Sequence, residues 1–277
     1  MNKPKISILL ATRKRTEMLK TSLASLVNLA SDPTSLEILL AFDNDDDETF
    51  VWVQENVLTD LDNKDVSYTC MSFERLGYIR LNEYYNKLAV EAEGDWLFFW
   101  GDDAIMKTQD WDLRITAHTG KFRMLRALTH KCHPLAIFPI VPKMWADMFG
   151  YFSAHQLNDN WVSQVAYMAD IVENIDVNIE HDRFDLTGNN NDENFQNRPM
   201  LEGNPNDPRD FHHVAWGKRR VADATKIIKY RKSQNEDTSW WDNVLAGTQD
   251  IWAKLKANDV NKQMVQFDLP QNLSAKP

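Results

Sequence analysis

The sequence predicts an α/β fold in which a mostly parallel central sheet is flanked by helices and followed by a helical C-terminal extension. Short apolar, β-branched runs alternate with stretches of helical periodicity through residues 1–104, the pattern of parallel strands joined by crossover helices. Charged or polar turns come directly after three of these runs. Because an open parallel sheet binds ligands at the carboxyl ends of its strands, these turns are where we expect a site.

Two strand–helix units open the chain. Residues 6–11 form a continuous apolar run of the buried-strand type, and apolar residues at helical spacing follow from Thr16. Residues 36–42 form a second buried run, and helical spacing resumes at Phe50 after an acidic turn. Each unit is predicted as a strand followed by a helix.

Two further strands complete the predicted parallel half. The alternation of Val66, Tyr68 and Cys70 predicts a strand, and the apolar spacing over residues 81–92 predicts the helix after it. Residues 96–100 are apolar on both faces, which predicts a fourth, fully buried strand.

The second half of the chain mixes strand and helix patterns. We expect a short strand over 136–140, helices over 143–149 and 161–171, and an alternating strand over 175–179 that ends at His181. Asn, Asp, Pro and Gly dominate residues 187–210, which predicts a long loop that is either a lid or disordered. Residues 211–260 have a helical pattern again, with Trp240 and Trp241 near apolar positions that indicate a core or helix-pair contact.

Composition excludes several classes of protein. The 277 residues carry a formal net charge of -10, which argues against coating of nucleic acid or an anionic membrane through the overall field, although residues 218–232 hold seven bases and one acid. Cys70 and Cys132 are too few for a disulfide framework, and no apolar run is long enough for a signal peptide or a membrane span. We therefore expect a cytoplasmic protein. Ten tryptophans against nine glycines indicate either an aromatic wall for sugar rings or core packing.

The turns after the first two strands carry polar side chains. Ala11, Thr12, Arg13 and Arg15 precede a helix N-terminus, a combination suited to phosphate or a nucleotide base, or simply to a solubilising turn. Asp43 follows the second strand, where it suits a hydrogen bond to a base or ribose, and the acids after it suit a helix start. The acidic run lacks the Gly and Glu that an EF-hand calcium loop requires.

Two adjacent carboxylates, Asp102 and Asp103, follow the apolar strand 96–100. Like charges this close raise each other's pKa unless a cation or hydrogen-bond donors lie between them. A divalent metal that bridges to a diphosphate would supply that charge. The sequence has no Walker A lysine loop and no GxGxxG turn after the first strand, which disfavours P-loop NTPases and ordinary dinucleotide enzymes.

Together these residues resemble the family 2 glycosyltransferases of the GT-A fold, over roughly residues 5–185. The resemblance implies that residues 6–15 are the family's first strand and donor loop, that Asp43 pairs with the nucleotide base, and that Arg80 meets the diphosphate. Phe42 stands in place of the first acid of the family's second-strand pair.

The resemblance also implies a metal site. Asp102 would contact the ribose and the diphosphate–metal group, Asp103 would ligate the metal directly, and His181 would complete the site as the family's late histidine. Gly101 stands where the Asp-x-Asp motif has its first acid. A lone histidine is more often a satisfied core or surface residue, so that alternative stays open for His181.

Motifs between Phe138 and Trp161 resemble the family's acceptor segment. There the resemblance implies that Asp159 is the catalytic base, which removes the proton of the acceptor hydroxyl as it attacks the anomeric carbon with inversion. Asn158 replaces the acid that usually precedes this base. By its position alone, Asp159 also suits a helix N-cap.

These matches divide the chain into three parts. Residues 1–185 would be a GT-A glycosyltransferase domain, with a nucleotide-sugar-binding half at 1–104 and an acceptor half at 105–185. Residues 186–210 would be a loop or lid, and residues 211–277 a helical C-terminal extension.

The implied function is transfer of a sugar from a nucleoside diphosphate sugar, with UDP favoured, to a hydroxyl acceptor, with Mn²⁺ or Mg²⁺ as cofactor. The acceptor stays open between a glycan or polyol and a hydroxymethylated base in DNA, for which residues 218–232 and the donor loop would form a positive groove. A sugar-phosphate nucleotidyltransferase would normally show a Gly-rich loop early in the chain, and residues 1–76 contain no Gly. A non-catalytic sugar-binding module would keep the tryptophans but has no use for paired carboxylates.

Overall fold

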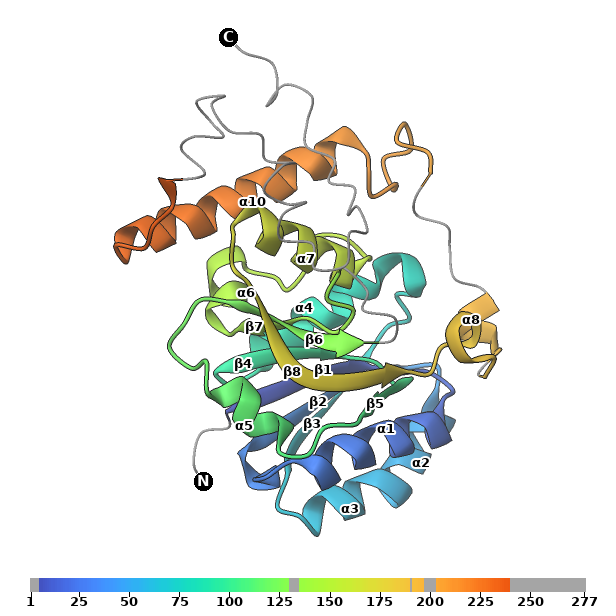
Figure 1. Cartoon of the computed structure of the whole chain (residues 1–277). Helices are drawn as coiled ribbons and strands as arrows, with labels where there is room; N and C mark the ends of the chain where they lie inside the picture. Colours follow the sequence, from blue (N-terminus) through green and yellow to red (C-terminus); the bar gives the residue numbers. More distant parts are fainter. Residues whose placement is uncertain (1–4, 130–134, 190, 197–202, 240–277) are drawn as a thin grey trace.

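The computed structural model describes residues 5–129, 135–189, 191–196 and 203–239. In this part of the chain eight strands form one sheet in the order β3-β2-β1-β4-β7-β6-β8-β5, and helices cover both faces (Figure 1). The predicted α/β class, with a mostly parallel sheet flanked by helices, is confirmed.

The parallel half of the sheet agrees with the prediction from the apolar runs. It consists of β1 (Ile6–Ala11), β2 (Leu36–Asp43), β3 (Ser67–Phe73) and β4 (Trp96–Trp100). At the centre, Ile8 of β1 lies opposite Ile38 of β2 on one side and Phe98 of β4 on the other. β1 and β2 are buried almost throughout, whereas β3 at the sheet edge is partly exposed, as its mixed sequence predicts. The carboxyl ends of the four strands meet at one edge.

The other half of the sheet is mixed. It consists of β5 (Ala104–Met106), β6 (Met124–Thr129), β7 (Ile140–Pro142) and β8 (Val172–His181). β7 is antiparallel to β4 and to β6, β6 is parallel to β8, and β5 is antiparallel to β8. The expected strand over 136–140 is misplaced, because β7 begins only at Ile140: Pro139 has no N–H group to donate to a ladder. The β5–β8 pairing sets His181 opposite Ala104, next to the acid pair.

One helical layer packs on the face that carries Ile6, Ile8 and Leu10. It contains α1 (Thr16–Leu29), α2 (Asp47–Val53), a π-helical turn (Gln54–Leu58), α3 (Thr59–Asp62) and α5 (Trp111–Thr116). Leucines of α1 at the predicted helical spacing point into this core.

The second layer packs on the opposite face, which carries Leu9, Leu39 and Leu97. It contains α4 (Leu81–Glu91), α6 (Met144–Phe149), α7 (Asn158–Met168) and α10 (Val214–Ser233). α7 begins at Asn158 rather than at Trp161, and α10 lies across it (Figure 1).

Short helical turns complete the described chain. They are the 3-10 turns Pro33–Ser35 and Tyr78–Arg80 and the helices α8 (Phe184–Thr187) and α9 (Glu193–Gln196). α10 is the part of the predicted C-terminal extension that is described. Its expected continuation through Trp240 and Trp241, like Cys132, lies outside the described residues. None of the described helices is both long enough and apolar enough to span a membrane.

Candidate functional site

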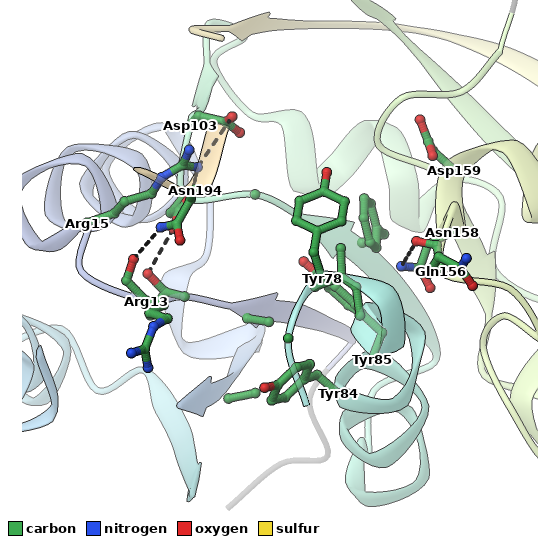
Figure 2. A pocket seen from close by; sticks show the side chains of 18 of the residues that line it. Arg13, Arg15, Tyr78, Tyr84, Tyr85, Asp103, Gln156, Asn158, Asp159 and Asn194 are labelled. Atoms are coloured by element: carbon green, nitrogen blue, oxygen red, sulfur yellow. Dashed lines mark hydrogen bonds and ion pairs between the residues drawn. The ribbon is translucent and has the colours of Figure 1, made fainter. Parts of the chain in front are cut away.

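A cavity of about 450 Å³ opens at the sheet edge where β1, β2 and β4 end. All the residues predicted for the site except Arg80 line it: Ala11, Thr12, Arg13, Arg15, Asp43, Asp102, Asp103, Asp159 and His181. The turn after β1, residues 11–15, which we call the donor turn after its expected role, and Asp103 lie on one side of the cavity, and Asp159 lies on the other (Figure 2). The structure therefore joins the donor turn, the acid pair and the start of α7 in one site.

Asp43 is held between the donor turn and α4. Its carboxylate accepts hydrogen bonds from Nη1 of Arg13, at 3.0 Å, and from the hydroxyl of Tyr84. The Tyr84 hydroxyl in turn accepts a hydrogen bond of 2.8 Å from the backbone N–H of Leu76, so its own proton points at Asp43. Burial and the neighbouring carboxylate raise the pKa of Tyr84 to about 12, which keeps the hydroxyl protonated at neutral pH. The sequence placed Tyr84 only among the apolar positions of its helix and gave no sign of this contact.

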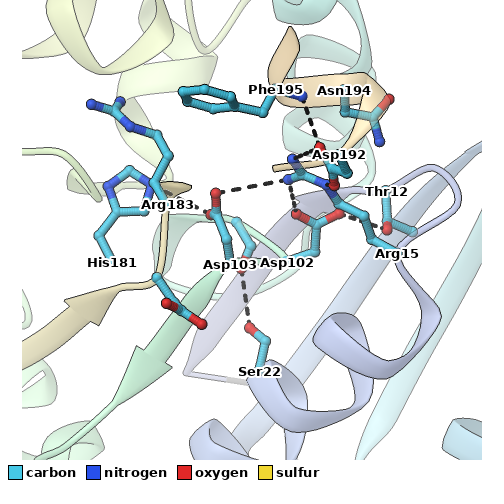
Figure 3. A network of polar contacts seen from close by, with 12 residues as sticks. Thr12, Arg15, Ser22, Asp102, Asp103, His181, Arg183, Asp192, Asn194 and Phe195 are labelled. Carbon is cyan, nitrogen blue, oxygen red and sulfur yellow. Dashed lines mark hydrogen bonds and ion pairs between the residues drawn. The ribbon is translucent and has the colours of Figure 1, made fainter. Parts of the chain in front are cut away.

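The acid pair is compensated by groups of the donor turn (Figure 3). Asp102 accepts hydrogen bonds of 2.8 Å from Oγ1 of Thr12 and from Nη1 of Arg15. Asp103 lies 3.7 Å from the same Arg15 nitrogen and 3.4 Å from Nε2 of His181. Burial raises the pKa of Asp102. At Asp103, burial acts in the same direction but is outweighed by His181 and the charge of Arg15, so the pKa of that carboxyl is lowered.

Gly101 lies close against the Asp103 carboxylate. A Cβ atom at Gly101 would lie 2.8 Å from Oδ1 of Asp103, closer than two such atoms can approach. The Gly101 carbonyl accepts a hydrogen bond of 3.0 Å from Oγ of Ser22 in α1, which fixes the turn after β4. A larger residue at position 101 would therefore displace the Asp103 carboxylate from the place it has in the structure.

The described residues include no group of three acidic, histidine or cysteine side chains arranged to hold a metal ion. Asp103 and His181 nevertheless offer one carboxylate and one imidazole side by side at the cavity wall. Mg²⁺ and related ions in nucleotide sites take one or two protein ligands and complete their shell with phosphate oxygens and water. This pair fits the protein part of such a site.

Asp159 lies in the first turn of α7. The N-cap of that helix is Leu157, which has no side-chain oxygen, so the interpretation of Asp159 as an N-cap is wrong. A carboxylate in a first turn is favoured by the helix dipole. Asp159 lines the cavity together with Asn158, whose buried Oδ1 has no hydrogen-bond partner among the described residues.

His155 holds the loop that leads into α7. Its Nδ1 accepts a hydrogen bond of 3.2 Å from the backbone N–H of Leu157, and its Nε2 lies 3.0 Å from the backbone carbonyl of Arg209. These partners require a neutral ring that carries its proton on Nε2. Burial lowers the pKa of His155 to about 4, which keeps the ring neutral at pH 7. The sequence did not single out this residue.

Arg80 does not line the cavity. Its side chain is 54% exposed and pairs with Glu83 through two hydrogen bonds of 2.6 Å. Arg75 and Arg183 line the cavity instead, and each follows the carboxyl end of a strand, β3 and β8 respectively. The rule that points to Asp43 and Asp103 would therefore have found both arginines.

The loop region around residues 191–196 also reaches the site. Asp192 forms two hydrogen bonds with Arg15, and Asn194 donates one of 2.7 Å to the backbone carbonyl of Arg13. Glu193 and Asn194 line the cavity. No periodic pattern in the sequence identifies these contacts, because they depend on how a loop folds back over the donor turn.

None of the described tryptophans lines the cavity. Five are fully buried, namely Trp96, Trp100, Trp111, Trp145 and Trp161. Core packing therefore accounts for these five tryptophans, and none of the described tryptophans forms an aromatic wall in this cavity.

Comparison with known proteins identifies the fold. No protein-family model matches the sequence, and no curated protein matches it. The structure is similar to S. aureus TarS 1-349 in complex with UDP-GlcNAc, with 13% identity, a TM-score of 0.56, and coverage of 91% of this chain and 83% of that one. For the complex of TarS 1-349 with UDP, the identity is 14%, the TM-score 0.51 and the coverage 96% and 94%. A mannosyltransferase from Pyrobaculum calidifontis, in complex with GDP-Man and Mn²⁺, matches with 12% identity, a TM-score of 0.53, and coverage of 86% and 66%. The chain has the GT-A-like α/β fold of these glycosyltransferases.

Proposed function

We propose that this protein is a glycosyltransferase that moves a sugar from a nucleoside diphosphate to a hydroxyl acceptor. The observation that carries the proposal is the cavity at the carboxyl ends of β1, β2 and β4, with Asp103 on one side and Asp159 on the other (Figure 2). His181 lines the same cavity, 3.4 Å from Asp103. The fold is that of proteins whose structures hold UDP-GlcNAc or GDP-Man.

Each end of the cavity suits one part of such a donor. Asp43, backed by Tyr84, offers carboxylate oxygens to the N–H groups of a base, and a UDP-sugar is our first choice. Arg15 offers a planar fork that matches phosphate oxygens. Asp103 and His181 would hold a divalent cation, and this cation would supply positive charge to the departing diphosphate.

Asp159 is the base in this proposal. It would accept the proton of the acceptor hydroxyl as the oxygen attacks the anomeric carbon from the side opposite the diphosphate, which inverts the configuration at that carbon. Its place across the cavity from Arg15 and Asp103 agrees with attack from that side (Figure 2).

A thermal-shift screen tests the donor assignment. We expect UDP, GDP or one of their sugars to raise the unfolding temperature, and to raise it more in the presence of Mn²⁺ or Mg²⁺. The metal-dependent part of the shift should disappear in Asp103→Asn. It should persist in Asp147→Asn, which alters an exposed acid on α6 paired with Lys143. No shift with any nucleotide would overturn the proposal.

A hydroxymethylated DNA base is a second candidate for the acceptor, and α10 supplies the observation that favours it. α10 contains seven basic residues. Two of them are buried, Arg220 and Arg231, and five are exposed: Lys218, Arg219, Lys226, Lys229 and Lys232. The single acid among them, Asp223, is buried, so this face carries positive charge alone.

Duplex binding as a function of salt concentration tests this acceptor. Binding should weaken steeply as salt rises, and a double variant Lys218→Glu/Lys229→Glu should abolish it. The matched control reverses two exposed lysines elsewhere, Lys64 and Lys121, and should bind like wild type. No binding at low salt would remove DNA as the acceptor.

A further inference from the structure

Residues 191–196 lie against the donor turn through charged contacts (Figure 3). Asp192 Oδ2 lies 2.5 Å from Nε of Arg15, and Asp192 Oδ1 lies 2.9 Å from Nη2 of the same side chain. Asn194 donates to the Arg13 carbonyl, and Glu193 lies 3.9 Å from Nζ of Lys14. The segment therefore contacts all three basic residues of the turn: Arg15 and Lys14 through the acids Asp192 and Glu193, and Arg13 through its backbone carbonyl.

The Asp192 contact uses the edge of Arg15 that a phosphate group would use. A guanidinium offers Nε and one terminal nitrogen as a parallel pair of donors, and carboxylates and phosphates both accept this pair in two-point fashion. The remaining nitrogen of Arg15, Nη1, donates to Asp102. With Asp192 in place, each of the three nitrogens of this side chain already faces a carboxylate.

The charges around Arg15 add to this competition. Asp102, Asp103 and Asp192 surround one guanidinium that is 14% exposed. A cluster of three carboxylates around one cation repels a diphosphate. Asp102 and Asp103 are anchored after the end of β4. Asp192 is therefore the carboxylate whose departure would make the site more favourable to an anion.

We propose that Asp192 occupies on Arg15 the place of a donor phosphate and must leave it when the donor binds, so that this residue sets the affinity for the nucleotide. The inference rests on the proposed function, since it assumes that the cavity takes a nucleoside diphosphate. Asp192 is in this account a competitor that lowers affinity and takes no part in the transfer.

Nucleotide affinity in Asp192→Asn tests the competition. The variant keeps an amide oxygen that can accept the hydrogen bond of 2.8 Å from the Phe195 N–H, but it loses the charge that competes with phosphate. By isothermal titration with UDP and with GDP, we expect the dissociation constant of the nucleotide that binds to fall about fivefold. The matched control is Asp176→Asn, which removes an exposed acid from its pair with Arg114 and should bind like wild type.

Hydrogen exchange gives a second, independent readout on the wild-type protein. If the nucleotide displaces Asp192, the amides of residues 191–196, that of Phe195 included, should exchange faster when nucleotide is bound. Slower exchange would mean that the segment closes onto the donor and would overturn the inference.

The two proposals fail in different ways. The inference about Asp192 is overturned if the wild-type protein binds a nucleotide and Asp192→Asn binds it with equal or lower affinity. The proposed function then still stands. If neither protein binds UDP, GDP or their sugars, the proposed function and the inference fall together.

Discussion

Arg15 forms ion pairs with three carboxylates at the cavity, those of Asp102, Asp103 and Asp192. The sequence predicts a cation or hydrogen-bond donors between Asp102 and Asp103, and a divalent metal would supply that charge. In the structure Arg15 contributes this charge, at 2.8 Å from Asp102 and 3.7 Å from Asp103, and Thr12 adds a hydrogen bond. The acid pair is therefore compensated within the chain.

Because Arg15 compensates the acid pair, removal of metal should have little effect on the stability of the protein without nucleotide. We expect the protein in excess EDTA to unfold within about 2 °C of its unfolding temperature in untreated buffer, because a perturbation well below 1 kcal/mol shifts the midpoint by no more than that. The metal should matter only when nucleotide is bound. A large fall in the unfolding temperature on chelation would contradict the assignment of Arg15 as the resident cation.

Asp159 is the residue on which the proposed chemistry depends. Asp159→Asn keeps the size of the side chain but removes the base, so we expect the transfer rate to fall by about 10² to 10⁴. Nucleotide affinity, measured by titration calorimetry, should stay within about twofold of wild type, a change of well under 1 kcal/mol. Asp147→Asn serves again as the control, and a normal transfer rate in Asp159→Asn would exclude it as the base.

At the scale of elements, two glycines at opposite ends of β4 serve different purposes. Gly101 leaves room for the Asp103 carboxylate after the strand. Gly94 precedes the strand, and a Cβ atom there would lie 2.5 Å from Oγ of Ser7 and 2.7 Å from its backbone nitrogen. The Gly94 N–H donates to this Ser7 hydroxyl, which itself donates to Glu37.

The two alanine variants should therefore behave differently. Gly94→Ala should lower the free energy of unfolding by about 2 kcal/mol, because β1 backbone must shift to admit the methyl group. Gly101→Ala should cost less stability, since a side-chain carboxylate can turn away, but it should remove most of the metal-dependent nucleotide binding. Urea unfolding and titration of each variant measure both effects, and identical behaviour of the two variants would contradict this account.

The elements that the sequence predicted well are those buried on both faces. β1 has the predicted bounds, and β2 extends the prediction by a single residue, because a short, β-branched apolar run between polar turns favours a strand buried on both faces. β6 was missed because Arg126 interrupts its apolar pattern; in the fold this arginine is buried and hydrogen-bonded to Asn174 and Tyr167. β5 has only three residues and forms by pairing with β8, which no local pattern can reveal.

The same division holds for the site. Residues at strand ends, such as Asp43 and Asp103, could be found because the fold class fixes where strand ends meet. Tyr84 and Asp192 could not, since their roles depend on side-chain hydrogen bonds to elements far away in the chain. Only the family resemblance points to Arg80, whose contact with Glu83 is local to the start of α4.

For the whole molecule, His155 predicts how stability depends on pH. The unfolded chain takes up a proton on this ring near pH 6.5, whereas the folded state resists protonation down to about pH 4. The free energy of unfolding is thus largest above pH 6.5 and falls as the pH drops, by on the order of 3 kcal/mol from this group at pH 4. Urea unfolding between pH 7 and pH 4 should show a shallower decline in His155→Gln than in wild type. Parallel curves for the two proteins would exclude His155 as the source.

The central claim is that the cavity at the carboxyl ends of β1, β2 and β4 activates a nucleoside diphosphate sugar. The most direct measurement is release of free nucleoside diphosphate from a panel of UDP- and GDP-sugars, with Mn²⁺ or Mg²⁺ and with EDTA, by wild type and Asp103→Asn. The account predicts slow release from at least one donor that requires the metal and is lost in the variant. Release that is equally fast in EDTA and in Asp103→Asn, or no release from any donor with any acceptor present, would contradict it.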